Sequence, residues 1–146
     1  MSRELGKLAK WLRILGFDTV YFRQNNKSSL VITAMRENRV VLTRNNKILE
    51  DRLLKTIFVK SLSVKEQLKE VLSNLDITPD QKLMFTRCTI CNTQLEHIEK
   101  DNIKSKVPSY VFDSQEDFFC CKVCGRIYWR GSHWGNVVEV IKGLKT

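Results

Sequence analysis

Two stretches decide the fold: Phe119-Cys120-Cys121-Lys122-Val123-Cys124-Gly125-Arg126-Ile127-Tyr128-Trp129 and, upstream of it, Arg87-Cys88-Thr89-Ile90-Cys91-Asn92. Each contains a Cys-x-x-Cys knuckle, and a glycine that permits a tight turn follows the second knuckle. A knuckle points both thiols to one side, so two knuckles can present four thiolates to one tetrahedral ion. Thiolates are soft ligands that favour zinc over hard cations. We therefore predict a zinc ribbon whose metal ligands are Cys88, Cys91, Cys121 and Cys124.

Disulfide bonding and redox chemistry are the alternatives for these cysteines. A disulfide-bonded domain suits an oxidising compartment, but we identify no signal peptide, and five cysteines are an odd number. A thioredoxin-like pair would open a helix, whereas strand-like residues flank both knuckles. Four sulfur ligands leave no position for water, so we expect structural zinc with Cys120 as a spare thiol. The long interval between the knuckles is expected to hold a hairpin arm.

The composition is that of a folded, basic protein. The 146 residues are 42% hydrophobic, and no apolar run approaches the length of a membrane span, so we expect a cytoplasmic protein without membrane association. The net charge is +9, and residues 1–60 hold thirteen basic and five acidic side chains, an excess of eight. A polyanion such as RNA is the expected partner of this part of the chain. Simple solubility is the alternative explanation of the charge.

Residues 3–15 predict an amphipathic helix that ends at Gly16. Its leucines fall on one stripe, and its cations fall on the other side without an intervening acid. A solvated basic face and a phosphate-binding face both fit this pattern. As candidate RNA contacts we name Arg3, Lys7, Lys10 and Arg13 here, with Arg44, Lys47 and His133 further along the chain. A structural hydrogen-bonding role is the alternative for His133.

Helix-like and strand-like segments alternate up to residue 78. Strands are predicted at 17–22, 39–43 and 57–60, and helices at 28–37, 47–54 and 64–75, the last with a capping box that begins at Ser63. Such alternation implies a parallel sheet with right-handed crossovers. Ligands of parallel sheets gather at the carboxyl ends of the strands, which here are the loops 23–27 and 43–46.

Thr78-Pro79-Asp80 breaks this pattern and marks a domain boundary. We therefore predict an α/β domain over residues 1–78 and a zinc ribbon domain over residues 79–146. Residues 136–144 suit a short closing helix. The zinc ribbon is also a possible docking surface for a protein partner.

Two further motifs resemble the Mut-seven C-terminal RNase domain family. They are Leu5-Gly6-Lys7-Leu8-Ala9-Lys10-Trp11-Leu12-Arg13-Ile14-Leu15-Gly16-Phe17-Asp18-Thr19 and Arg126-Ile127-Tyr128-Trp129-Arg130-Gly131-Ser132-His133, with Leu42-Thr43-Arg44 and the two knuckles in the expected order between them. The resemblance spans nearly the whole chain. It implies a PIN-like α/β nuclease domain, with a parallel sheet and flanking helices, followed by a small zinc ribbon.

The resemblance also implies RNA cleavage by Mg²⁺ or Mn²⁺ held by clustered carboxylates. One family Asp lies on a first strand that this chain is expected to lack, and the two other acidic positions hold Asn26 and Asn45 here. A neutral amide cannot replace a carboxylate that holds a divalent ion. Asp18, Glu50 and Asp51 are the remaining candidates for catalytic carboxylates, but Glu50 and Asp51 are helix neighbours that point about 100° apart.

Three functions stay open at this point. The first is an RNA-binding protein whose nuclease site is degenerate. The second is an active ribonuclease that uses Mg²⁺ or Mn²⁺ with one of the remaining carboxylates. The third is an adaptor in which the zinc ribbon binds a protein and the positive charge is incidental.

Overall fold

A computed structural model describes residues 5–22, 26–45, 53–131 and 133–144, with the backbone alone at positions 133 and 134. The chain divides into two compact units. Unit 1 contains Met1–Leu12 and Thr19–Thr78, and unit 2 contains Arg13–Asp18 and Pro79–Thr146. The domains predicted as 1–78 and 79–146 stay a prediction, because these units are defined by contacts and not by independent folding.

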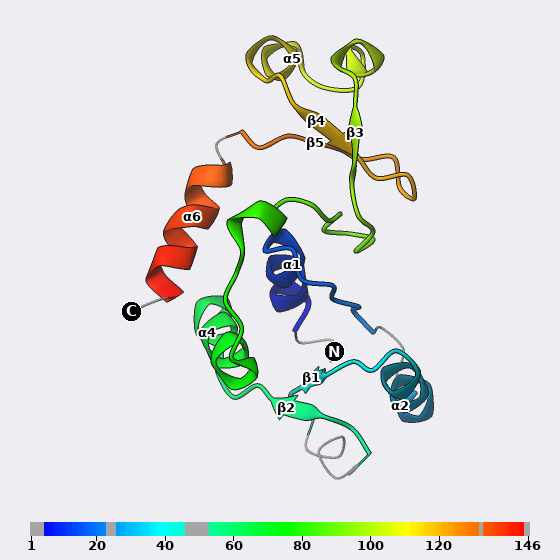
Figure 1. The fold of residues 1–146 in the computed structure, drawn as a ribbon, viewed down its shortest axis with the longest axis vertical. Helices are drawn as coiled ribbons and strands as arrows, with labels where there is room; N and C mark the ends of the chain where they lie inside the picture. Colours follow the sequence, from blue (N-terminus) through cyan, green and yellow to red (C-terminus); the bar gives the residue numbers. More distant parts are fainter. Residues whose placement is uncertain (1–4, 23–25, 46–52, 132, 145–146) are drawn as a thin grey trace. The chain divides into compact units, whose positions relative to one another are not determined.

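Helices and a small parallel sheet make up unit 1 (Figure 1). Its elements in chain order are the greater part of α1 (Gly6–Ile14), α2 (Lys27–Arg36), β1 (Val41–Thr43), β2 (Thr56–Phe58) and α4 (Val64–Leu75). β1 and β2 pair in parallel, with Leu42 opposite Ile57. The predicted α/β class is therefore confirmed. The described part of the sheet has two strands, so the PIN-like arrangement stays a prediction.

The strand predicted at residues 17–22 is wrong, because these residues have no regular secondary structure. Polar groups at and just before the start of this segment are bonded to loop residues instead. The carbonyl of Gly16 accepts from Arg87 Nε, and Asp18 Oδ1 accepts from Asn92 Nδ2. The helix predicted at 47–54 lies mostly outside the described residues.

Side-chain caps explain where two helices of unit 1 begin. Asn26 Oδ1 accepts from the backbone N–H of Ser29, so Asn26 is the N-cap of α2, which begins one residue before the helix predicted at 28–37. Ser63 Oγ accepts from the N–H of Glu66 and begins α4 as predicted. Buried apolar side chains from α1, the sheet and α4 form the interior of unit 1: Leu5, Leu8, Ala9, Leu12, Val41, Leu42, Val59, Leu68, Val71 and Leu72.

Unit 2 is built on an antiparallel sheet of β3 (Glu96–Ile98), β4 (Phe118–Cys120) and β5 (Ile127–Tyr128). β3 and β4 form the predicted arm, and η3 (Lys100–Ile103) and α5 (Ser109–Ser114) lie at its far end (Figure 1). The arm has its own core of Ile103, Val107, Val111 and Phe118, with Trp129 packed against it.

The remaining elements of unit 2 are η2 (Gln81–Leu83) and α6 (His133–Leu144), the predicted closing helix. Gly16 in this unit has a φ of 95°, and a Cβ at this position would overlap the carbonyl oxygen of Leu83. Only glycine fits where the chain leaves α1. Among the described residues, no helix combines the length and the apolar character needed to cross a membrane.

Candidate metal centre

The first knuckle is a turn closed by its own backbone. The N–H of Cys88 donates to the carbonyl of Thr93 at 2.9 Å, and the N–H of Asn92 donates back to the carbonyl of Cys88 at 2.9 Å. Asn92 has a φ of 64°, a left-handed conformation that asparagine tolerates better than most residues. Inside the turn, the N–H of Cys91 donates to Cys88 Sγ at 3.4 Å. The turn therefore directs both thiols to its inner side.

The second knuckle has the same construction between β4 and β5. The N–H of Cys121 donates to the carbonyl of Arg126 at 3.0 Å, and the N–H of Gly125 donates to the carbonyl of Cys121 at 2.8 Å. Gly125 has a φ of 76°, so the predicted role of this glycine in the turn is confirmed.

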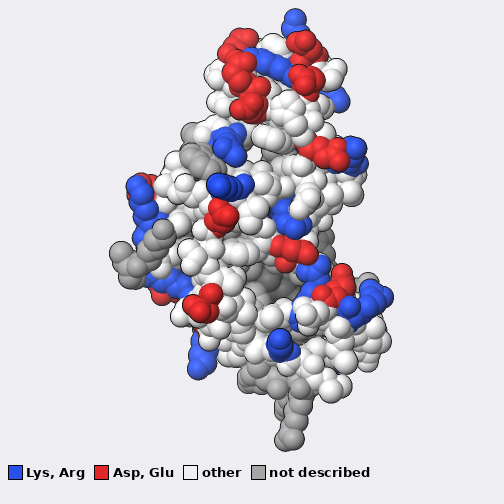
Figure 2. Space-filling view, in the orientation of Figure 1, with Lys and Arg blue, Asp and Glu red and all other residues white. Residues whose placement is uncertain are grey.

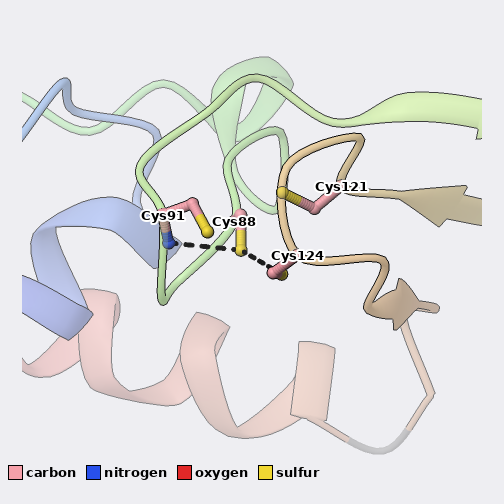
Figure 3. A group of neighbouring side chains, drawn as sticks. All are labelled: Cys88, Cys91, Cys121 and Cys124. Atoms are coloured by element: carbon pink, nitrogen blue, oxygen red, sulfur yellow. Dashed lines mark hydrogen bonds between the residues drawn. The ribbon is translucent and has the colours of Figure 1, made fainter.

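The two knuckles bring four sulfur atoms together. Figure 3 shows Cys88 and Cys91 on one loop facing Cys121 and Cys124 on the other. The four Sγ atoms all lie within 4.8 Å of one another, and Cys88 Sγ is 3.7 Å from Cys124 Sγ. A tetrahedral ion with metal–sulfur bonds of about 2.3 Å separates its ligands by about 3.8 Å. The predicted convergence of these cysteines is confirmed, and their geometry and chemistry fit a metal such as zinc.

Neighbouring groups make the four thiols unequal. Burial alone would raise the pKa of Cys88, but hydrogen bonds from the Tyr128 hydroxyl and from backbone N–H groups outweigh it and lower the pKa to about 7. Desolvation, with hydrogen bonds shared with Cys124 and Cys121, raises the pKa of Cys91 to about 12. Several negative thiolates this close repel one another unless a cation balances them.

Cys120 stands apart from this group. It lies on β4, half-buried, opposite Glu96 and Ile127 on the neighbouring strands, and it forms no disulfide. Its role as the spare thiol agrees with the spacing, because Cys121 and not Cys120 joins the metal-binding group.

The candidate RNA contacts have different surroundings. Lys7 and Lys10 are exposed on α1, whereas Arg13 is 8% exposed and its Nη1 donates to the carbonyls of Thr89 and Ile90 at 2.8 and 3.1 Å. The predicted exposed basic face therefore does not include Arg13. The reason is that the end of α1 belongs to unit 2, where the knuckle carbonyls are available.

Arg44, at the carboxyl end of β1, is also used inside the protein. Its Nη1 donates to the carbonyls of Val59 and Ser61, both at 2.9 Å, and thereby links the ends of the two parallel strands. Arg3 and Lys47 lie outside the described residues, as does the side chain of His133.

The catalytic candidates that the structure describes do not come together in a cluster of carboxylates. Asn26 caps α2, and the backbone N–H of Asn45 donates to Thr43 Oγ1 at 2.9 Å. Asp18 lies in the segment that belongs to unit 2, where its Oδ1 accepts from Asn92 Nδ2 at 2.6 Å. Glu50 and Asp51 lie outside the described residues. Within the described part of the chain, the side chains that come together in a group able to hold a metal ion are the four cysteines.

Sequence reasoning missed Gln67 and Glu70, which α4 places beside the end of β2. Gln67 Nε2 donates to the carbonyl of Ser61 at 3.0 Å. The Glu70 carboxylate accepts from the N–H groups of Lys60 and Ser61 at 2.8 and 3.1 Å. One signal was available, because Gln67 is a polar residue three positions after Val64 and four before Val71 on an otherwise apolar stripe.

Comparison with known proteins identifies the family of this chain. No protein with a curated function and no solved structure matched the chain. A family model described as the Mut7-C RNAse domain matches residues 1–141 of the 146. That match includes unit 1 and both cysteine knuckles, so the chain belongs to the Mut7-C RNAse domain family.

Proposed function

We propose that this protein binds RNA through its basic unit 1, holds a structural zinc ion in unit 2, and does not hydrolyse its ligand. The observation that supports it most is the chemistry at the carboxyl ends of β1 and β2. That edge of the sheet carries a guanidinium from Arg44, an amide from Asn45, and a single described carboxylate, that of Glu70.

The side chains at this edge of the sheet disfavour RNA hydrolysis that depends on a divalent ion. Mg²⁺ and Mn²⁺ need anionic oxygens to hold them, and the ion must then activate water and neutralise developing charge. Both oxygens of Glu70 already accept backbone N–H groups. Two other described carboxylates of unit 1 pair with nearby cations, Glu37 with Arg39 and Glu66 with Lys69. This edge balances one guanidinium against one carboxylate and lacks the cluster of acids that would hold a divalent ion.

Zinc is the metal that suits unit 2. Four thiolates at tetrahedral spacing select a soft or borderline ion, and four protein ligands leave no coordination position for water or substrate. The ion would therefore stabilise the fold and take no part in chemistry.

The distribution of charge favours unit 1 over the arm as the RNA surface. Between residues 96 and 120 the arm holds six acidic and three basic side chains. Figure 2 shows red and blue groups side by side at its far end, where Lys100 pairs with Glu116 at 3.3 Å. Lys7 and Lys10 of unit 1, in contrast, are exposed on a helix face without an acid between them. Phosphates should therefore gather on unit 1.

The test is a single experiment on the purified protein with labelled single-stranded RNA. One set of reactions contains Mn²⁺ and the other contains EDTA, and binding is followed in parallel at low and moderate salt. We expect a shift of the RNA that weakens with salt, because phosphate contacts release counterions. We expect no cleavage with either additive. The variant Lys7→Glu/Lys10→Glu should weaken binding, and Glu116→Gln on the arm serves as the control.

Active ribonuclease is the second candidate function, and the family name together with the position of Glu70 favours it. It predicts Mn²⁺-dependent cleavage that is lost in EDTA and in Asp51→Ala or Glu70→Gln. A third outcome, in which no RNA binds even at low salt, would contradict both functions and leave the zinc ribbon as a protein-docking module.

A further inference from the structure

We propose that residues 13–18 form a brace for the first cysteine knuckle, and that Arg13 is a positioning residue of the metal centre. The proposal rests on the structural zinc ion proposed above. The brace and the knuckle are far apart in sequence, but both belong to unit 2.

Arg13 holds the two residues that lie between the ligands of the first knuckle. Its guanidinium donates to the carbonyls of Thr89 and Ile90, which separate Cys88 from Cys91. Arg13 is 8% exposed, and a charged group so deeply buried is tolerated only with close polar partners. The carbonyls therefore cannot rotate freely, and the peptide planes between the two cysteines are held in one orientation.

Further hydrogen bonds join the brace to both sides of the knuckle. The backbone N–H of Phe85 donates to the carbonyl of Ile14 at 2.9 Å, and Arg87 Nε donates to the carbonyl of Gly16 at 3.3 Å. After the knuckle, Asn92 Nδ2 donates to Asp18 Oδ1 at 2.6 Å, and the carbonyl of Asn92 accepts from Arg87 Nη1 at 2.9 Å. Contacts before, within and after the turn thus involve the same short segment.

The consequence for metal binding is orientation and charge balance. A fixed turn keeps the N–H of Cys91 directed at Cys88 Sγ and keeps both thiols on the inner side. Zinc with four thiolates carries a net charge of about −2, and a permanently charged guanidinium next to the turn stabilises that charge. Groups that orient metal ligands in this way typically change metal affinity by about 10- to 100-fold. Arg13 would thus act on the ion through the backbone, without touching it.

This role differs from a phosphate contact and from general packing. A phosphate contact needs an exposed guanidinium, whereas this one is buried. General packing would affect the stability of unit 2 without changing how the thiolates surround the ion. Metal affinity and the coordination spectrum therefore separate the brace from both.

The experiment measures zinc release from the zinc-loaded protein of 146 residues by competition with a chromogenic chelator. Wild type is compared with Arg13→Met, which removes the donors, and Arg13→Lys, which keeps the charge but not the planar fork. Lys82→Met is the control, because it removes an exposed cation from the same unit. The same variants are loaded with Co²⁺, whose thiolate-to-metal absorption bands report ligand geometry.

We expect the zinc affinity of Arg13→Met to be about 10- to 100-fold lower than that of wild type. The absorption bands of its cobalt-loaded form should also differ from those of wild type. Arg13→Lys should lie between the two, and Lys82→Met should match wild type. If Arg13→Met does not fold, Arg13→Lys measured against Lys82→Met decides the result. Unchanged zinc affinity and cobalt spectra in the folded Arg13 variants would overturn the brace. A wild type that binds no zinc would overturn the proposed metal itself and leave the RNA experiment as a separate question.

Discussion

Unit 1 and unit 2 use the same kinds of amino acid in different ways. Unit 1 buries apolar side chains from its helices and its sheet, and α4 alone buries Leu68, Val71 and Leu72. Around its knuckles, unit 2 has four converging thiols, and the side chains of Arg13 and Arg87 donate hydrogen bonds to backbone carbonyls there. Turns such as the two knuckles hold little apolar area of their own, and a bound metal ion can supply their stability. The comparison therefore predicts that metal loss and core mutation damage different units.

The largest effect should come from removing one metal ligand. Cys124→Ser is expected to lose about one equivalent of zinc and to unfold the knuckle region, because the free energy of structural metal binding is also folding free energy. Metal analysis and circular dichroism measure the two changes. Cys120→Ser is the matched control and should retain the metal, since Cys120 lies outside the group. A folded Cys124→Ser protein without metal would contradict the assignment.

A core mutation in unit 1 should show the opposite pattern. Leu68 is 0% exposed, and Leu68→Ala is expected to reduce the free energy of unfolding by about 2–5 kcal/mol through lost burial and the cavity that remains. Urea unfolding measures this loss, and metal analysis should still find zinc in the protein. Loss of zinc under native conditions would mean that the two units unfold together.

Removing a helix cap should destabilise the same unit by a smaller amount. Ser63→Ala deletes the hydroxyl that accepts from the N–H of Glu66, and it should cost about 1 kcal/mol of stability. Ser73→Ala, at an exposed position of the same helix, should cost less. Equal losses in the two variants would show that the cap contributes nothing beyond helix propensity.

The smallest effect should depend on pH. Burial would raise the pKa of Glu70, but hydrogen bonds from the N–H groups of Lys60 and Ser61 outweigh it and lower the pKa. A lowered folded-state pKa contributes stability above the unfolded pKa, and this contribution is lost as the pH falls through the folded value. Glu70→Gln should therefore be less stable than wild type at neutral pH, and the difference should shrink below about pH 4.3. A difference independent of pH would exclude an ionic origin.

Local signals made much of the fold predictable. Ser63 caps α4, and Gly16 and Gly125 adopt the positive φ of a helix end and a tight turn, as predicted. These roles were predictable because caps and tight turns depend on neighbouring residues. The Cys-x-x-Cys spacing predicted the metal-binding group for the same reason. The interval between the knuckles correctly indicated an arm, although the helices at its end were not foreseen.

Other features could not be predicted from local sequence. The cation at position 13 follows the helical pattern of Lys7 and Lys10, yet its partners are carbonyls 76 and 77 residues away. The segment 17–22 has a strand-like composition, but Asp18 within it bonds to a residue 74 positions along the chain. Periodicity reports which face of an element is apolar and carries no information on distant partners.

The sequence by itself determined which four cysteines converge, the N-cap of α4 and the tight turn at Gly125, because these depend on spacings of a few residues. Only the tertiary structure decided that Arg13 and Asp18 bond to residues of the first knuckle and that Arg44 and Glu70 bond to backbone groups at the end of the sheet. A buried charge takes whichever partners the fold places beside it, since an unpaired charge in the interior is too costly to remain. The function of a charged residue here follows from its surroundings and not from its position in a motif.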